Sequence, residues 1–383
     1  MTKGRSFRAA FLHPQPVHQP QNQPNRNRHS YRHAQRSKRC GACRRGANAK
    51  HGCVASHHSL INHELGVRPV NEGMNILPCT NARPGLVPLA LQQHPNYLRA
   101  VQFMGGAAQA FLIQEAADQI ARVQVLQRRF GPIAVNWIAR GPVWDTQIVD
   151  AQKHQALRAL CNALPRAAIT LAAPDSTADA AAFRPQHFRP LMTPQYMAEL
   201  DLTQPTEVRL ASQHGKWRNR LRHAQTEGVT VSDRPFRHGK DHHLLALEEG
   251  QRRTKRYRAL PHSFVHHWVR ANPHCTQVFL AHGPQGFQAY LLVLLHRPTA
   301  TYLIGWTGAE GRRSSAHALL LWTASNWLAD RGYLRFDLGL VDTENAPGLA
   351  RFKIGSGAAI HPLGPTMMRL GLPRRERRKY PAA

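Results

Sequence analysis

The chain has 383 residues, of which 51 are Lys or Arg and 22 are Asp or Glu, so its formal net charge is +29. This length is sufficient for two ordinary domains, and the charge requires partners that are anionic or that tolerate cations, such as nucleic acid, nucleotide-linked substrates and phosphorylated carriers. Six scattered cysteines exclude a secreted disulfide framework, and no run approaches the ~20 apolar residues that span a bilayer. We therefore expect a cytoplasmic protein without a membrane span.

Residues 1 to 73 form a basic extension, with 13 Lys or Arg against 2 Asp or Glu. Gln, Asn, Arg, His and Pro dominate much of it, a composition that cannot bury enough apolar surface to fold, so we expect disorder. Cys40, Cys43 and Cys53, with a histidine four residues later, offer one possible zinc site. The alternative is a basic tail or a non-native extension upstream of Met74. A single Cys-x2-Cys pair is common by chance, and we predict no metal.

Residues 74 to 192 predict a first α+β lobe. Alternating and β-branched residues indicate strands and longer periodic runs indicate helices. The expected elements are a helix at 94–105, three strands at 108–115, 119–128 and 133–140, a helix at 150–163 and a strand at 168–171. A helix, a three-strand meander, a second helix and a final strand form a compact lobe with a mixed, mostly antiparallel sheet.

Residues 193 to 366 repeat this order and predict a second lobe. One long helix from Thr203 to Gly228 is expected to bury the stripe of Leu210, His214, Trp217, Leu221 and Ala224. The other expected elements are strands at 196–202, 229–231, 276–282, 286–296, 300–307 and 334–338, and helices at 241–257, 262–271 and 315–331. Residues 367 to 383 read as a basic tail. The two rounds suggest a duplication, although no repeat is visible residue by residue.

The segment from Tyr302 to His317 places an Arg/Gly/Ser loop between a strand and a buried helix. Backbone N–H groups at a helix start can bind a pyrophosphate, and the arrangement resembles that of acetyl-CoA-dependent N-acetyltransferases, the GNAT superfamily. That superfamily has a basic residue or Gln followed by Gly-x-Gly/Ala, whereas this chain has Ser314, Ser315, Ala316 and His317. Their side chains would crowd a pyrophosphate, which disfavours coenzyme A.

Two further blocks resemble the Fem family of peptidoglycan-bridge aminoacyltransferases. One is Asp337-Leu338-Gly339 followed by Gly348-Leu349 and Phe352-Lys353-x-Gly355, and the other is the basic run from Lys216 to Gly228. Ser356 departs from the family, which usually has an aromatic residue there. The resemblance covers about 94–365 and is strongest from 196 to 361. It implies two tandem GNAT-like lobes.

Three residues are candidates for catalysis. The resemblance places Lys353 at the active site, where its ammonium group would stabilise the oxyanion of a tetrahedral intermediate. Asp337 ends a central strand and could act as a base or position the amine, or could pair with Arg335 or Arg351. His317 could shuttle a proton.

A second group is predicted to bind substrate. Arg218 and Arg222 lie one helical turn apart, so both guanidinium groups could contact one anion. The alternative is an ordinary solvated basic face. The full set of predicted substrate-binding residues is Lys216, Arg218, Arg222, Tyr302, Trp306, Arg312, Arg313 and Asn345.

The sequence thus predicts an enzyme that moves an activated acyl or aminoacyl group onto an amine. We expect no tightly bound cofactor and a co-substrate that is aminoacyl-tRNA or an acyl-CoA. A nucleotide- or phosphate-linked acceptor in cell-wall precursor metabolism would suit the charge. The alternatives are a CoA-dependent N-acetyltransferase and, from another class, a nucleic-acid-binding protein. The oligomeric state is not predicted.

Overall fold

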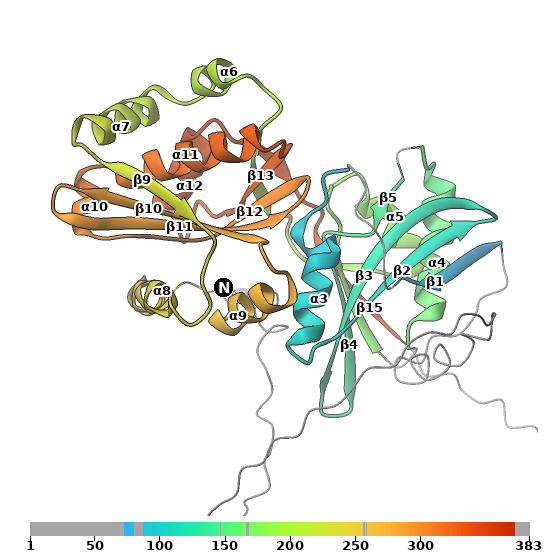
Figure 1. The fold of residues 1–383 in the computed structure, drawn as a ribbon. Helices are drawn as coiled ribbons and strands as arrows, with labels where there is room; N and C mark the ends of the chain where they lie inside the picture. The colour runs from blue at the N-terminus through green and yellow to red at the C-terminus, as the bar shows by residue number, and fades with distance from the viewer. Residues whose placement is uncertain are drawn as a thin grey trace, which may run out of the picture.

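The computed structural model describes residues 73–79, 87–145, 147–165, 168–255, 257 and 259–371. Nearly all of the expected disordered extension, including Cys40, Cys43 and Cys53, lies outside these residues, as does the chain beyond 371. The described residues form two β-sheets with helices packed on them, one sheet in each lobe (Figure 1).

The first sheet has eight strands in the order β1-β2-β3-β4-β6-β15-β7, with β5 paired to β3. It is mixed, because β4 and β6 run parallel while the other neighbours are antiparallel. The strands are Met74–Pro78 (β1), Ala107–Glu115 (β2), Asp118–Phe130 (β3), Ile133–Ala139 (β4), Val143–Trp144 (β5), Ala168–Ala173 (β6), Arg189–Met192 (β7) and Thr366–Leu370 (β15). Its helices are Leu91–Gln93 (η1), Pro95–Phe103 (α3), Asp150–Ala163 (α4), Ala180–Phe183 (α5) and Arg184–Gln186 (η2).

The second sheet has seven strands in the order β14-β8-β13-β12-β11-β10-β9, and only β12 and β13 are parallel. The strands are Tyr196–Asp201 (β8), Thr230–Arg234 (β9), Thr276–Gly283 (β10), Gly286–His296 (β11), Thr299–Thr307 (β12), Arg335–Val341 (β13) and Ala359–Pro362 (β14). The helices are Thr206–Ala211 (α6), Gly215–Thr226 (α7), His242–Lys255 (α8), His262–Ala271 (α9), Ala309–Arg313 (α10), Ala316–Asp330 (α11) and Pro347–Gly355 (α12). These two mixed sheets are the α+β pair of lobes that the sequence predicted.

The chain returns to the first sheet after it has built the second, because its last described strand, β15, lies in the first sheet. In the first sheet β15 lies between β6 and β7, and in the second β8 lies between β13 and β14. These are equivalent positions, because β6 and β13 are the strands that run parallel to β4 and β12. Residues 367–370, expected in a basic tail, therefore form a sheet strand. Met367 explains the difference, because its side chain is 1% exposed in the first lobe's core.

Helices cover both faces of the second sheet. In Figure 1, α7 and α11 lie on one face while α8 and α9 lie on the other. Helix α11 is apolar around most of its circumference and packs on β10, β11 and β12. Helix α9 also packs against α3 of the first lobe, where Phe264 and Trp268 join an apolar cluster with Tyr97 and Leu98. The lobes thus share a hydrophobic contact.

The helix expected from Thr203 to Gly228 is two helices, α6 and α7. His214 separates them: its backbone is extended and its side chain accepts a hydrogen bond from Lys216 N, which begins α7. Trp217, Leu221 and Ala224 are buried as expected, whereas Leu210 and His214 are exposed. Because the helix breaks at His214, the apolar stripe of α7 does not continue onto α6, although the sequence pattern predicted that it would.

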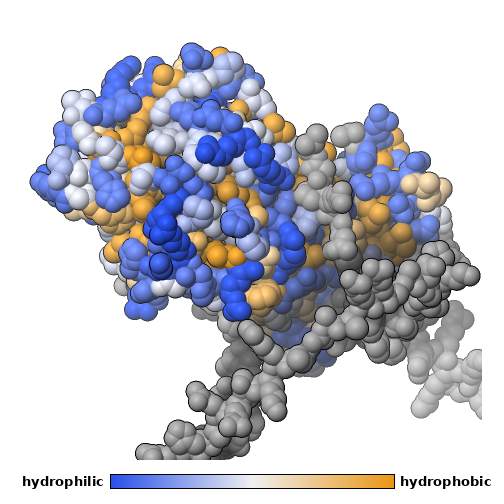
Figure 2. Space-filling view, viewed as in Figure 1, coloured by the Kyte–Doolittle hydropathy of each residue, from blue (hydrophilic) through white to orange (hydrophobic). Residues whose placement is uncertain are grey.

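Among the described residues, no helix is long and apolar enough to cross a membrane. The face of the second lobe seen in Figure 2 is mostly hydrophilic, with apolar residues in separated patches.

Candidate functional site

Lys353 lies on α12 with its side chain inside the second lobe. The residue is 6% exposed, and its Nζ donates a hydrogen bond of 2.8 Å to the Leu340 carbonyl oxygen. Gly339 lies against this ammonium: an added Cβ would be 3.5 Å from Nζ, an ordinary contact, and the φ of +83° is what favours glycine here. Burial lowers the pKa of Lys353 to about 8, against the opposing effect of the Asp337 carboxylate. Lys353 is thus a buried side chain that still carries its positive charge near pH 7.

Asp337 lies beside Lys353 but is fully engaged. Its Oδ2 accepts a hydrogen bond of 2.7 Å from Arg140 Nη1, and its Oδ1 accepts one of 2.7 Å from Gly339 N. Arg335, which the sequence suggested as an ion-pair partner, lies 3.5 Å from Glu199 instead. The carboxylate of Asp337 is therefore held in place as an anion.

Arg140 follows β4 of the first lobe and was not predicted as a site residue. Its guanidinium is buried and contacts three carboxylates, those of Asp175, Glu199 and Asp337. Burial lowers the pKa of Arg140, but the three carboxylates outweigh burial and raise it overall. No sequence motif marked this arginine, because its contact with Asp337 joins positions 197 residues apart.

His317, Tyr302 and Thr307 form a second polar group at the start of α11. His317 Nε2 lies 2.9 Å from the Tyr302 hydroxyl, and His317 Nδ1 lies 3.2 Å from Thr307 Oγ1. Burial lowers the pKa of His317 to about 4 and raises the pKa of Tyr302. Both are therefore neutral near pH 7. The Phe352 ring packs 5.5 Å from the His317 ring, so the residue preceding Lys353 connects the two groups.

The loop before α11 does not leave its backbone N–H groups open to a phosphate. Ser314 is buried, and its hydroxyl donates 2.7 Å to Gln288 Oε1. Ser315 is in the left-handed region with φ +59°. Arg312 donates 2.6 Å to the Thr307 carbonyl oxygen, and Arg313 pairs with Glu310. Both arginines remain exposed at this edge of the lobe.

The predicted anion-binding pair on α7 does not converge. Arg218 Nη1 donates to the carbonyl oxygens of Ala211, at 3.0 Å, and Gln213, so this guanidinium caps the end of α6. Arg222 is exposed and donates 2.9 Å to Asn219 Oδ1. Lys216 is exposed as well.

Trp306 and Asn345 lie apart from the polar groups. Trp306 stacks on Phe287 with ring centroids 5.7 Å apart and packs with the apolar cluster under α8. Asn345 is exposed, and its backbone and side-chain nitrogens donate to Asp342, which shapes the turn before α12.

A buried network near β12 also escaped the sequence reasoning. Glu248 accepts hydrogen bonds from the Tyr257 hydroxyl at 2.9 Å and lies 2.6 Å from His262 Nε2. Gln251 donates to the Gly305 carbonyl oxygen at 3.3 Å, which ties α8 to β12 beside Tyr302. The side chains come from α8, α9 and the segment between them and carry no recognisable motif, and Gly305 lies 54 positions from Gln251.

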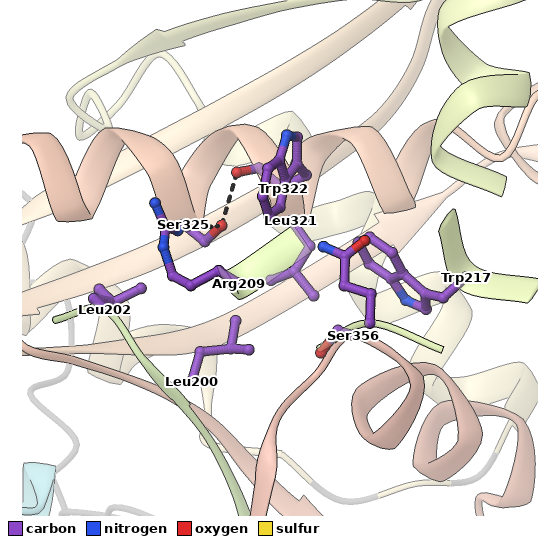
Figure 3. Close-up of a pocket in the computed structure, with 9 residues that line it drawn as sticks. Leu200, Leu202, Arg209, Trp217, Leu321, Trp322, Ser325 and Ser356 are labelled. Atoms are coloured by element: carbon purple, nitrogen blue, oxygen red, sulfur yellow. Dashed lines mark hydrogen bonds between the residues drawn. The ribbon is translucent and has the colours of Figure 1, made fainter. Parts of the chain in front are cut away.

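Two cavities lie near these groups. One, of about 10 Å³, lies between α6, α7 and α11 (Figure 3), is lined partly by Arg209, Trp217 and Ser356, and has room for about one water molecule. The other, of about 330 Å³, is a cleft of the first lobe beyond β5 and β6. Asp175, which pairs with Arg140, lines this cleft. The described part of the chain holds no group of three or more potential metal ligands.

Comparisons with known proteins agree with this architecture. Residues 211–353 match the family model described as an acetyltransferase (GNAT) domain. Among solved structures, FemX is similar with 14% identity and a TM-score of 0.60, over 73% of this chain and 93% of FemX. A tandem GNAT protein from the clavulanic acid biosynthesis pathway is similar with 11% identity and a TM-score of 0.48, over 79% of this chain and 99% of that one.

No curated protein matches the chain. The FemX likeness concerns the fold, and the domain match covers Lys353, Asp337 and His317. The chain therefore contains an acyltransferase domain of the GNAT superfamily, within a two-lobed fold similar to that of FemX.

Proposed function

We propose that the second lobe transfers an acyl or aminoacyl group from an activated donor to an amine, with Lys353 as the oxyanion stabiliser. The observation that carries the proposal is the buried Lys353 ammonium, which uses one N–H for Leu340 and has two more to donate. A fixed cation in a poorly hydrated site stabilises charge that develops in the transition state.

In the proposed reaction the acceptor amine attacks the donor carbonyl carbon. The new C–N bond forms while the carbonyl oxygen becomes an oxyanion beside Lys353 Nζ, and collapse of the intermediate breaks the bond to the leaving oxygen or sulfur. The amine must also lose a proton. His317 is neutral, because burial lowers its pKa to about 4, so the Tyr302–His317 pair would pass this proton on to the leaving group without storing it.

Asp337 is better suited to positioning than to base catalysis. Arg140 and the Gly339 N–H each bind one of its oxygens, and the residue is 2% exposed, so the carboxylate is fixed toward Arg140. The proposed role of Asp337 is to support the Lys353 ammonium, because the carboxylate favours the protonated form.

We propose aminoacyl-tRNA as the donor. The left-handed Ser315 and the buried Ser314 leave little free backbone at the start of α11 for a pyrophosphate. The exposed cations Lys216, Arg222 and Arg312 offer contacts for a longer phosphate backbone. An acceptor from cell-wall precursor metabolism belongs to the same proposal.

A CoA-dependent N-acetyltransferase is the second candidate, favoured by the matched domain model. Mass spectrometry of products distinguishes the two when the purified full-length protein is incubated with amine-bearing cell-wall precursors and either acetyl-CoA or aminoacyl-tRNA. An aminoacylated product supports the first proposal. An acetylated product, with micromolar binding of acetyl-CoA in isothermal titration, would replace it with the second.

A further inference from the structure

Arg140 connects the two lobes at the candidate active site. It is 2% exposed, follows the last residue of β4, and contacts Asp175 of its own lobe and Asp337 of β13. Its third partner, Glu199, lies on β8, the strand between β13 and β14 in the second sheet. One guanidinium thus joins the lobes through three carboxylates.

The backbone at Arg140 is strained in a way that preserves this contact. Its φ is +54°, a left-handed backbone conformation that residues other than glycine rarely adopt. Its N–H nevertheless donates 2.7 Å to the Ala173 carbonyl oxygen, which holds the conformation. Such strain persists only where surrounding contacts compensate for it. Here the compensating contacts are the hydrogen bond to Ala173 and the three carboxylates, and the side chain reaches Asp337 of the second lobe.

Arg140 can influence Lys353 through one carboxylate, that of Asp337. Arg140 binds Asp337 Oδ2, while Asp337 Oδ1 binds the N–H of Gly339, the residue that lies against Lys353 Nζ. Other charged groups near the lysine are accounted for. On α7, which packs against α12, Arg218 is held by backbone carbonyls, and on α11 His317 is neutral.

The remaining charges lie on the far side of Arg140. Arg335 of β13 and His361 of β14 face Glu199, at 3.5 and 4.0 Å. His296 of β11 is buried, and its pKa is held well below its usual value by burial and by the neighbouring charges. Asp337 is therefore the only anion among the described residues shown to act on the Lys353 ammonium.

We propose that Arg140 is a positioning residue through which the first lobe sets the charge state of Lys353, by fixing and partly neutralising Asp337. The inference rests on the proposed function, in which the protonated lysine is the active form. It makes the second lobe's chemistry dependent on a residue that lies outside the matched acyltransferase domain.

The direction of the effect follows from the charges. Removing the guanidinium leaves the Asp337 anion uncompensated, so it favours the Lys353 ammonium more strongly and raises the lysine pKa. Removing the Asp337 charge has the opposite effect and lowers that pKa. A charge acting over a few ångströms in a partly buried site shifts a pKa by about one unit.

The test is a pH titration of the Lys353 side chain by NMR in full-length protein labelled with ¹⁵N at lysine Nζ, assigned with Lys353→Arg. We expect Arg140→Gln to raise the Lys353 pKa by about one unit and Asp337→Asn to lower it by a similar amount. Arg140→Lys keeps the charge and should lie between wild type and Arg140→Gln. Asp175→Asn is the matched control, because it removes one partner of Arg140 but leaves Asp337 in place, and it should leave the Lys353 pKa unchanged.

An unchanged pKa in a folded Arg140→Gln protein, or shifts of the same sign in Arg140→Gln and Asp337→Asn, would overturn the proposal. If Arg140→Gln does not fold, Arg140→Lys and Asp337→Asn decide: no shift in either contradicts it. The titration needs no substrate, so its result is separate from the proposed transfer reaction. A shifted pKa in an enzyme without acyl transfer would reject the proposed function and retain the electrostatic link.

Discussion

At the scale of single residues, the charge of Lys353 and two glycines define the site. Lys353 carries an ammonium in a poorly hydrated position, and burial lowers its pKa to about 8. Gly305 leaves room for the Tyr302 hydroxyl and the His317 ring, because a Cβ there would overlap both. Gly339 lies against Nζ, and its φ of +83° favours glycine.

The lysine pKa predicts the pH dependence of transfer. If the ammonium is the active form, it is present below pH 8 and is lost as pH rises through the pKa of about 8. The limiting rate should therefore fall above pH 8, approaching about tenfold per pH unit. Single-turnover rates between pH 6 and 10, with saturating donor and acceptor, provide the measurement. A rate that is level or rising to pH 10 would show that transfer does not need the protonated form of Lys353.

Gly305→Ala should disrupt the Tyr302–His317 pair. The added Cβ would overlap the Tyr302 hydroxyl and approach His317 Cε1 to 2.8 Å, so β12 or the tyrosine must move. We expect a loss of about 1–3 kcal/mol in unfolding free energy, with reduced transfer. Gly250→Ala is the control, because a Cβ there meets nothing within 4 Å. Urea unfolding that is identical for both variants would contradict the assigned packing.

The sequence identified some of these residues better than others. Lys353 and Gly339 belong to a short motif, so their neighbourhood could be predicted from a resemblance. Arg140 could not be, because its role depends on a contact across 197 positions and on a left-handed backbone that no local pattern specifies. Arg218 and Arg222 donate to different acceptors, because carbonyls at the end of α6 compete for Arg218, which helical spacing does not reveal.

At the scale of elements, the connection between α6 and α7 depends on side-chain capping. His214 begins α7, and Arg218 closes α6 by donating to the Ala211 and Gln213 carbonyl oxygens. The same break gives the small cavity its walls, because Arg209 lies on α6 and Trp217 on α7. The periodic pattern predicted one helix here, because apolar residues continue at helical spacing across His214, the N-cap of α7.

Arg218→Ala and Arg222→Ala should therefore differ. Loss of the Arg218 guanidinium leaves two carbonyl groups without that donor, and we expect a loss of about 1–2 kcal/mol in unfolding free energy. Arg222 makes one exposed contact with Asn219, and its removal should change stability by less than about 0.5 kcal/mol. Urea unfolding monitored by circular dichroism measures both. Equal losses, or a larger loss for Arg222→Ala, would refute the capping role.

At the scale of the whole molecule, the lobes are joined by a strand as well as by side chains. Strand β15 completes the first sheet after the chain has built the second. Helix and strand order along the chain predicted two α+β lobes. It could not predict that β15 joins the first sheet, because nothing in five residues of a strand indicates which of two similar sheets they join.

Truncation tests the contribution of β15 to the first sheet. A chain ending at residue 365 lacks β15, which separates β6 from β7 and removes Met367 from the first lobe's core. We expect it to lose more than about 3 kcal/mol of stability, or to be insoluble. A chain ending at residue 371 keeps β15 and should unfold as the full-length protein does. Equal unfolding midpoints for the two truncations would contradict the strand's structural role.

The most direct test of the account is the rate of acyl transfer by Lys353→Ala under single-turnover conditions, measured by mass spectrometry of the product. The donor and acceptor are those that the wild-type protein joins. We predict a rate lower by about 10²–10³, the usual effect of removing one oxyanion donor, with circular dichroism like that of wild type. Lys353→Arg, which keeps a cation, should retain more activity than Lys353→Ala. A Lys353→Ala rate near that of wild type would contradict the central claim.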